Sequence, residues 1–168
     1  MSARESIIPV FVPHLGCPND CVFCNQRRIS GSVTPATPQD VVEAIERAKT
    51  LTGPETRRQL AFYGGSFTAI PVSEQEALLD AAGPYLESGE IVSLRLSTRP
   101  DAIDAATLKR LKAYGVETIE LGAQSMSERV LALSGRGHTA QDVEDASAQV
   151  KAAGFKLILQ RMTGLPGA

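Results

Sequence analysis

Three cysteines in one short segment carry the strongest chemical signal of the chain. Cys17, Cys21 and Cys24 form a C-x3-C-x2-C pattern and are the only cysteines among the 168 residues. Cysteine thiolates hold iron–sulfur clusters in proteins, and a [4Fe-4S] cluster has four irons to be ligated. Three cysteines leave one iron without a protein ligand. The spacing therefore predicts a cluster with one iron open to a small molecule.

A zinc site is the alternative interpretation of the same cysteines. Three thiolates with His14 as the fourth ligand make a chemically sound zinc set, and the protein would then be a structural or binding module. Zinc sites of this kind usually join two separated ligand pairs, whereas all these ligands crowd into one segment. The crowding favours the cluster. His14 and His138 are otherwise interpreted as hydrogen-bonding loop histidines.

Charge and composition indicate the compartment. Lysine and arginine total 17 against 19 acidic residues, so no general basic field favours nucleic acid or an anionic membrane. No apolar run is long enough to predict a signal peptide or a membrane span. An odd number of cysteines in one loop argues against a disulfide framework and for metal binding under reducing conditions. We expect a cytoplasmic protein without a membrane partner.

Apolar runs alternate with helical patterns along the chain. The runs predict strands over residues 7–12, 59–63, 91–97, 117–121 and 156–160. Strands separated by helices imply an α/β fold with a parallel sheet and outer helices. Pro9 lacks the donor that an interior strand needs, which places the first strand at an edge. We therefore expect a partial (β/α) barrel of parallel strands, open at one side.

Capping residues and glycines predict the helix ends. Thr37 and Ser73 each precede an acidic residue by three positions, as in a capping box, and are expected to open the first and second helices. Thr139 is expected to start the fourth helix. Gly115 and Gly154 are expected to end the third and fourth helices. Pro84 is expected to kink or end the second helix.

The amount of apolar material predicts one domain over residues 1–168. Hydrophobic residues make up 43% of the chain, enough for one core. The last residues follow directly after the fifth predicted strand, without a helix to cover it or a sixth strand. A parallel sheet is normally covered on both faces, so we expect the domain to be incomplete at its C-terminus, with five strands of six.

Side chains that can bind a ligand follow the predicted strands. In parallel α/β folds the functional groups gather at the C-terminal ends of the strands. Gly64 and Gly65 end the second strand, where the absence of side chains lets the backbone approach the amino group of an amino-acid-like cofactor. A tight strand–helix turn is the alternative explanation of this pair.

Six motifs together make the chain similar to a known family. It resembles radical S-adenosylmethionine proteins, and more narrowly the radical domain of the elongator catalytic-subunit family. The motifs are residues 13–24 (PHLGCPNDCVFC), 62–67 (FYGGSF), 98–101 (TRPD), 119–125 (IELGAQS), 136–139 (RGHT) and 164–167 (GLPG). The cysteine motif is specific for the superfamily, and the others point to the narrower group.

The resemblance implies a mechanism and a set of contacts. A [4Fe-4S] cluster on Cys17, Cys21 and Cys24 binds S-adenosylmethionine and cleaves it reductively, which gives methionine and a 5′-deoxyadenosyl radical. Gly64 and Gly65 meet the methionyl amino group through backbone carbonyls. Phe23 occupies the aromatic position whose backbone lies against the adenine.

Further residues are assigned by the same resemblance. Glu120 and Gln124 are expected to contact the ribose hydroxyls or the carboxylate, the alternative being an inward residue satisfied by its neighbours. Arg99 and Arg161 could each pair with the carboxylate or form a structural ion pair. Many members of the superfamily have a glutamate after the two glycines, whereas this sequence has Ser66. The serine is interpreted as a feature of the elongator-like subgroup.

The implied partners follow from the family. The resemblance points to tRNA as substrate, by modification of a wobble uridine, and to a one-electron donor such as flavodoxin or ferredoxin. The chain shows neither an acetyl-coenzyme A domain nor a basic N-terminal extension, which weakens the tRNA assignment. A third interpretation is an inactive fragment that binds a cluster without sealing it from water.

Overall fold

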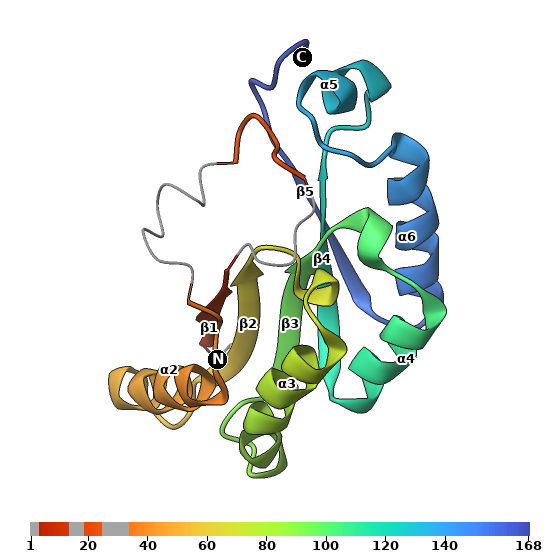
Figure 1. Cartoon of the computed structure of the whole chain (residues 1–168). Helices are drawn as coiled ribbons and strands as arrows, with labels where there is room; N and C mark the ends of the chain where they lie inside the picture. The colour runs from red at the N-terminus through yellow and green to blue at the C-terminus, as the bar shows by residue number, and fades with distance from the viewer. Residues whose placement is uncertain (1–3, 14–18, 25–33) are drawn as a thin grey trace.

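The fold is one parallel sheet with helices packed on its outer face (Figure 1). The structure, a computed structural model, describes residues 4–13, 19–24 and 34–168. Its five strands are hydrogen-bonded in the order β1-β2-β3-β4-β5, and every neighbouring pair is parallel. The sheet is not closed, because β1 and β5 form its two edges. The predicted fold class, a partial barrel of parallel strands, is confirmed.

All five predicted strands are present, with somewhat different ends. The strands are β1 (Glu5–Val12), β2 (Arg57–Gly64), β3 (Ser93–Thr98), β4 (Val116–Gln124) and β5 (Lys156–Arg161). The helices are α2 (Pro38–Leu51), α3 (Val72–Glu87), α4 (Ala105–Ala113), α5 (Glu128–Leu133) and α6 (Ala140–Ala152), with 3-10 turns η2 (Phe67–Ala69) and η3 (Pro100–Ala102). Helix α5 was not predicted. Pro9 lies in edge strand β1, as its missing donor requires.

One of the two predicted capping boxes is confirmed, and the predicted helix start at Thr139 has a capping box as well. Thr37 and Thr139 each accept a hydrogen bond from the backbone N–H three residues on, and Asp40 and Asp142 return it. The capping box at Ser73 is wrong, because α3 already begins at Val72, directly after Pro71.

Glycines end helices where expected, whereas a proline does not. Gly115 and Gly154 follow the last turns of α4 and α6 with φ of 88° and 82°, which suits a residue without Cβ. Helix α3 continues three residues beyond Pro84. Near the end of a helix, proline removes only one intrahelical hydrogen bond, and the N–H of Ser88 still bonds the Pro84 carbonyl at 3.0 Å.

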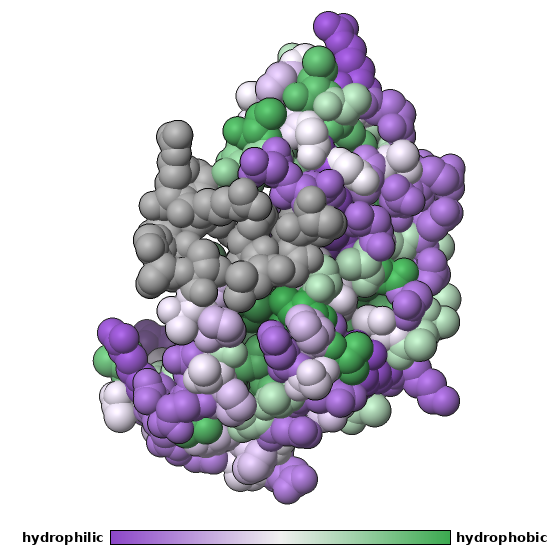
Figure 2. All heavy atoms as spheres, in the orientation of Figure 1, coloured by the Kyte–Doolittle hydropathy of each residue, from purple (hydrophilic) through white to green (hydrophobic). Residues whose placement is uncertain are grey.

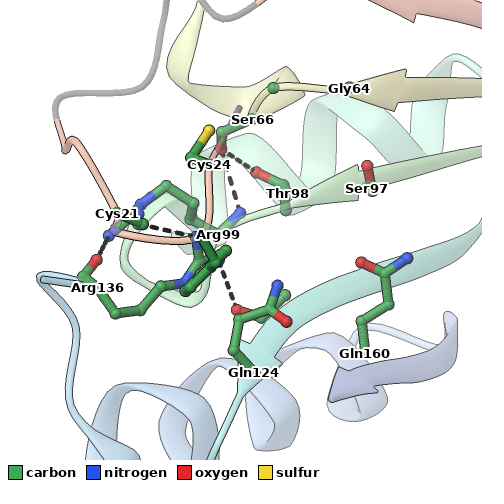
Figure 3. Close-up of a pocket in the computed structure, with 13 residues that line it drawn as sticks. Cys21, Cys24, Gly64, Ser66, Ser97, Thr98, Arg99, Gln124, Arg136 and Gln160 are labelled. Atoms are coloured by element: carbon green, nitrogen blue, oxygen red, sulfur yellow. Dashed lines mark hydrogen bonds between the residues drawn. The ribbon is translucent and has the colours of Figure 1, made fainter. Parts of the chain in front are cut away.

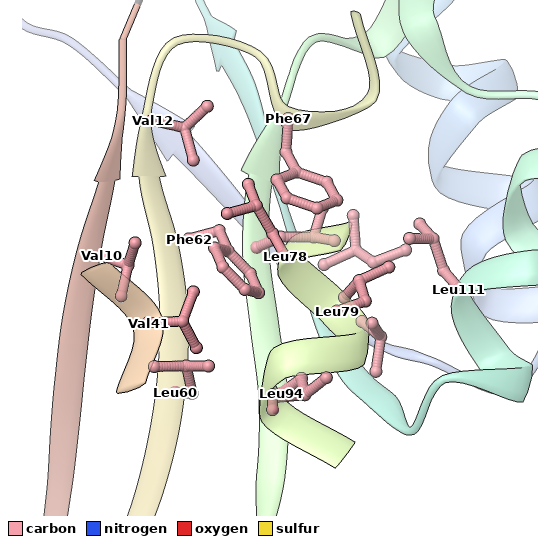
Figure 4. Packing of buried hydrophobic residues seen from close by; sticks show 14 of the residues in the cluster. Val10, Val12, Val41, Leu60, Phe62, Phe67, Leu78, Leu79, Leu94 and Leu111 are labelled. Atoms are coloured by element: carbon pink, nitrogen blue, oxygen red, sulfur yellow. The ribbon is translucent and has the colours of Figure 1, made fainter. Parts of the chain in front are cut away.

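The hydrophobic core lies between the sheet and the helices (Figure 4). Alternate residues of each strand face the helices, as in Leu60 and Phe62 of β2, which are fully buried. The helices contribute apolar side chains to this core, among them Val41, Leu79 and Leu111. The rings of Phe62 and Phe67 pack with their centroids 4.9 Å apart. This core holds the strand ends in fixed positions.

The opposite face of the sheet is polar in its middle. The register places Tyr63, Arg95 and Glu120 on this inner face, one from each of three neighbouring strands. Phe11 at the β1 edge and Ile158 at the β5 edge are exposed. Each edge of the inner face thus exposes an apolar side chain, whereas its centre carries hydrogen-bonding groups.

The outer surface in view is mainly hydrophilic, with hydrophobic side chains over α5 (Figure 2). Leu133 of α5, and Met126 and Met162 in the segments after β4 and β5, are exposed. Among the described helices, none has the length and apolar character needed to cross a membrane.

Candidate functional site

A pocket of about 270 Å³ lies at the C-terminal ends of the strands. Small-molecule pockets usually occupy about 300–1,000 Å³, so its size is near the lower end of that range. Its lining comes from the cysteine segment, the ends of all strands except β1, and the segment between α5 and α6 (Figure 3). The lining residues are Cys21, Phe23, Cys24, Gly64, Gly65, Ser66, Ser97, Thr98, Arg99, Gly122, Gln124, Arg136 and Gln160.

Two of the three motif cysteines line this pocket. Cys21 is buried and Cys24 is half-buried, and the N–H of Cys24 donates to the carbonyl of Cys21 at 2.8 Å. The segment is tied to the end of α5, because the N–H of Val22 donates to the Ser134 carbonyl at 3.0 Å. Cys17 and His14 lie outside the described residues. Phe23, Cys21 and Cys24 are thus brought together at the mouth of the sheet.

Gly64 brings the end of β2 close to the end of β1. Its φ is 113°, a conformation that residues with a Cβ rarely adopt. The next N–H, of Gly65, donates to the carbonyl of Val12 at 2.9 Å. Both glycines expose backbone to the pocket without side chains. The predicted glycine pair therefore lies where a ligand can approach the main chain.

Ser66 is a buried link between the ends of β2 and β3. Its Oγ accepts a hydrogen bond from the N–H of Arg99 at 3.1 Å and lies 2.7 Å from Oγ1 of Thr98. The residue is 2% exposed. Its hydroxyl is already committed to its own chain, which leaves it a structural contribution at the pocket wall.

Gln124 reaches the pocket from a distorted end of β4. Its φ is 63°, and the pairing with β5 shifts register between Gly122 and Gln124. Nε2 of His138 lies 3.2 Å from the Ala123 carbonyl and donates to it, since a carbonyl only accepts. Burial lowers the pKa of His138, and the positive charge of Arg136 lowers it further. A neutral buried histidine thus supports the turn that carries Gln124.

Glu120 belongs to an ion-pair network on the inner face. It forms an ion pair with Arg95 and accepts a hydrogen bond from the hydroxyl of Tyr63 at 3.0 Å. Gln160 donates to its other oxygen at 3.4 Å. Burial and the charge of Glu120 raise the pKa of Tyr63. Glu120 is not among the residues that line the pocket, so the structure does not bring it together with Gln124 there.

Arg99 and Arg161, the two arginines that could pair with the cofactor carboxylate, lie in different places. Arg99 lines the pocket, and its guanidinium forms a bidentate pair with Asp101 at 2.9 and 3.1 Å. Arg161 is exposed at the end of β5 and is not among the lining residues. The structural ion pair, one of the two alternatives for Arg99, is therefore present.

Arg136 is a pocket residue that the sequence analysis did not select. It is 8% exposed, and its Nη1 lies 3.7 Å from Sγ of Cys21. A separation of 115 residues along the chain hides this contact from any local pattern. The one signal in the sequence was the motif at residues 136–139, which points to the family but not to a contact with Cys21.

Comparisons with known proteins agree with this geometry. The model of the radical SAM superfamily matches residues 11–168. The tRNA uridine(34) acetyltransferase of Dehalococcoides mccartyi is 24% identical over 192 residues, covering 96% of this chain and 42% of that protein. Elongator complex protein 3 of Saccharomyces cerevisiae is 27% identical over 139 residues, covering 73% of this chain and 25% of that protein.

A solved structure supports the fold independently. The archaeal Elp3 of Methanocaldococcus infernus superimposes with a TM-score of 0.74 at 22% identity, covering 100% of this chain and 40% of that one. The chain thus spans less than half the length of these relatives. With the family model matched over nearly its whole length, the chain belongs to the radical S-adenosylmethionine superfamily, and its relatives include Elongator complex protein 3.

Proposed function

We propose that this chain is a radical S-adenosylmethionine enzyme domain that holds a [4Fe-4S] cluster on Cys17, Cys21 and Cys24. The bound cluster would supply an electron that cleaves S-adenosylmethionine into methionine and a 5′-deoxyadenosyl radical. One observation carries the proposal. Cys21 and Cys24 line the same pocket as Gly64 and Gly65, although some 40 residues separate the two motifs.

The residues at the pocket fit such a cluster. Thiolates are its usual ligands, and hydrogen bonds to the sulfurs are among the factors that set its potential. Cys21 presents its sulfur next to the buried guanidinium of Arg136, whose Nη1 lies 3.7 Å away and can donate a hydrogen bond to it. The wall behind it is closed by buried residues such as Thr98 and Arg99, which limit the access of water.

The chain's own groups then bind and orient the cofactor. In this proposal the carbonyls of Gly64 and Gly65 accept hydrogen bonds from the methionyl ammonium, which glycine allows because no side chain intervenes. The backbone at Phe23 lies against the adenine. Gln124 offers an amide to the ribose or the carboxylate. A contact between Glu120 and the ribose stays a prediction, because Arg95 and Tyr63 occupy that carboxylate here.

The substrate proposed is tRNA, at a wobble uridine. The support is that relatives carry the name tRNA uridine(34) acetyltransferase and that the six motifs match the elongator group. A one-electron donor such as flavodoxin or ferredoxin would reduce the cluster. The reducing cytoplasm is the compartment in which such a site persists.

Anaerobic reconstitution tests the proposal. Protein loaded with iron and sulfide, reduced with dithionite and given S-adenosylmethionine should produce 5′-deoxyadenosine, measured by liquid chromatography and mass spectrometry. Cys21→Ala, treated in parallel, should produce none. Absence of 5′-deoxyadenosine from protein that holds four irons would refute the proposed reaction. One zinc per chain in a colourless protein would support the zinc-module alternative instead.

A further inference from the structure

Arg136 places a buried positive charge against the sulfur of Cys21. Its Nη1 lies 3.7 Å from that sulfur, a distance compatible with an N–H to sulfur hydrogen bond. The centre of the guanidinium also lies 6.0 Å from the centroid of the Phe23 ring. The same side chain thus lies beside the Phe23 ring and the sulfur of Cys21, both in the cysteine segment. Figure 3 shows Arg136 and Cys21 together at the pocket.

The position of this guanidinium is fixed from several sides. Its Nη2 donates to the carbonyl of Gly122 at 2.6 Å. A Cβ on Gly122 would lie 2.7 Å from Nη2, so the absence of a side chain there is what admits the guanidinium. The Arg136 carbonyl accepts hydrogen bonds from Nη2 of Arg99 at 2.8 Å and from Nδ2 of Asn19 at 3.3 Å. Backbone and side chain are therefore both anchored.

The charge of Arg136 is directed at the sulfur and not at a carboxylate. Among the described residues, no acidic side chain forms an ion pair with Arg136. The nearby Asp101 is paired with Arg99, and Glu120 is paired with Arg95. In a buried site of low effective dielectric, such a charge acts strongly on a neighbouring group that changes its own charge.

We infer that Arg136 is a positioning residue that raises the reduction potential of the cluster through Cys21. The inference rests on the proposed function, in which Cys21 is a cluster ligand. One-electron reduction adds one negative charge to the cluster. A fixed cation and an N–H directed at a ligating sulfur stabilise the reduced state more than the oxidised state, so the potential rises.

The experiment compares three variants after anaerobic reconstitution. Arg136→Gln removes the charge, Arg136→Lys keeps the charge but not the planar fork, and Arg110→Gln removes a half-buried guanidinium that bonds Gln75 on the far side of the core. Midpoint potentials are measured by redox titration followed by electron paramagnetic resonance (EPR), without S-adenosylmethionine. We expect Arg136→Gln to lower the equilibrium constant of reduction about tenfold, which is 59 mV for one electron.

The remaining variants test whether the potential depends on the charge of Arg136 in particular. Arg136→Lys should lie between Arg136→Gln and the unmodified protein, and Arg110→Gln should not change the potential. An unchanged potential in Arg136→Gln with full iron content would overturn the inference, even if cofactor binding is lost. If Arg136→Gln does not retain iron, Arg136→Met, which also removes the charge, takes its place, and an unchanged potential in that variant would overturn the inference. Failure of 5′-deoxyadenosine formation in the unmodified protein would refute the proposed function alone, since the potential is measured without the cofactor.

Discussion

Gly64 lies so close to Val12 that a Cβ added to the glycine would be 2.4 Å from the Val12 carbonyl oxygen. Such a distance is shorter than any real non-bonded contact of a Cβ, and the neighbour is backbone that cannot rotate away. The same glycine has a φ of 113° and lines the pocket. The absence of a side chain at Gly64 therefore explains both the close approach of β1 and β2 and the exposed backbone at the pocket.

Gly64→Ala should damage both the fold and the pocket. The backbone conformation alone costs a residue with Cβ about 1–3 kcal/mol, and the contact with Val12 adds to this. We expect a lower free energy of unfolding by urea and reduced iron retention. Gly83→Ala is the matched control, because nothing lies within 4 Å of its added Cβ and it is inside α3. It should stabilise the protein by about 0.5–1 kcal/mol. Equal stability of the two variants would contradict this account.

Ser66→Ala should weaken the fold without removing the cluster. The change leaves the buried N–H of Arg99 without its acceptor, at a cost of about 1–3 kcal/mol. Iron content after reconstitution should stay near that of the unmodified protein, whereas Cys21→Ala or Cys24→Ala should abolish the cluster. Urea unfolding and iron analysis measure the two effects separately. A comparable loss of iron in Ser66→Ala and Cys21→Ala would show that Ser66 acts on the cluster.

Glu120 and Gln124 should separate into structural and binding roles. Glu120→Gln leaves the largely buried charge of Arg95, whose side chain is 13% exposed, without its carboxylate, which costs up to about 3 kcal/mol of stability. Gln124→Ala removes a pocket side chain with little effect on folding, and should weaken S-adenosylmethionine binding as measured by calorimetry. The double change Arg95→Met with Glu120→Leu should recover stability relative to Glu120→Gln. A large loss of cofactor affinity in that stable double variant would instead support the predicted ribose contact of Glu120.

Stability should fall with pH below about 6.5 because of His138. Its folded-state pKa is lowered, so the unfolded chain binds the proton more readily. The contribution to stability is therefore complete above the ordinary pKa near 6.5 and is lost as the pH falls through the folded-state value. The carboxyls with resolved shifts, such as Asp104 and Asp142, have pKa values lowered from 3.8 and act in a more acidic range.

Comparison with His138→Asn checks this assignment. Urea unfolding is measured in steps from pH 7.5 to 5, a range that excludes most carboxylate titration. The unmodified protein should lose stability over this range, whereas the variant should show a flatter profile. The same slope in both proteins would assign the pH dependence to another group.

Local sequence patterns predicted most of the scaffold. Apolar runs located all five strands, and Pro9 correctly indicated an edge. Thr37 and Thr139 identified helix starts because their hydrogen bonds are made within four residues. The start at Ser73 was wrong because Pro71, with its fixed φ, takes the N-cap position and α3 already begins at Val72. Patterns that depend on near neighbours were the reliable ones.

The arrangement of the site depends on contacts that no local pattern contains. Arg136 meets Cys21 across 115 residues, and Glu120 meets Tyr63 across 57 residues. The residue types were visible, but which charge neutralises which carboxylate is decided by the register of the strands. The sequence therefore predicted the pocket's membership better than its internal pairing.

The proposed open iron can be tested most directly by EPR of the reduced protein with and without S-adenosylmethionine. Reconstituted protein reduced under anaerobic conditions should give the signal of a reduced [4Fe-4S] cluster, and addition of S-adenosylmethionine should shift that signal because the cofactor binds the iron without a cysteine ligand. S-adenosylhomocysteine, which lacks the sulfonium methyl group, serves as the comparison. A cluster signal that S-adenosylmethionine leaves unchanged, or protein that holds no iron, would contradict the account.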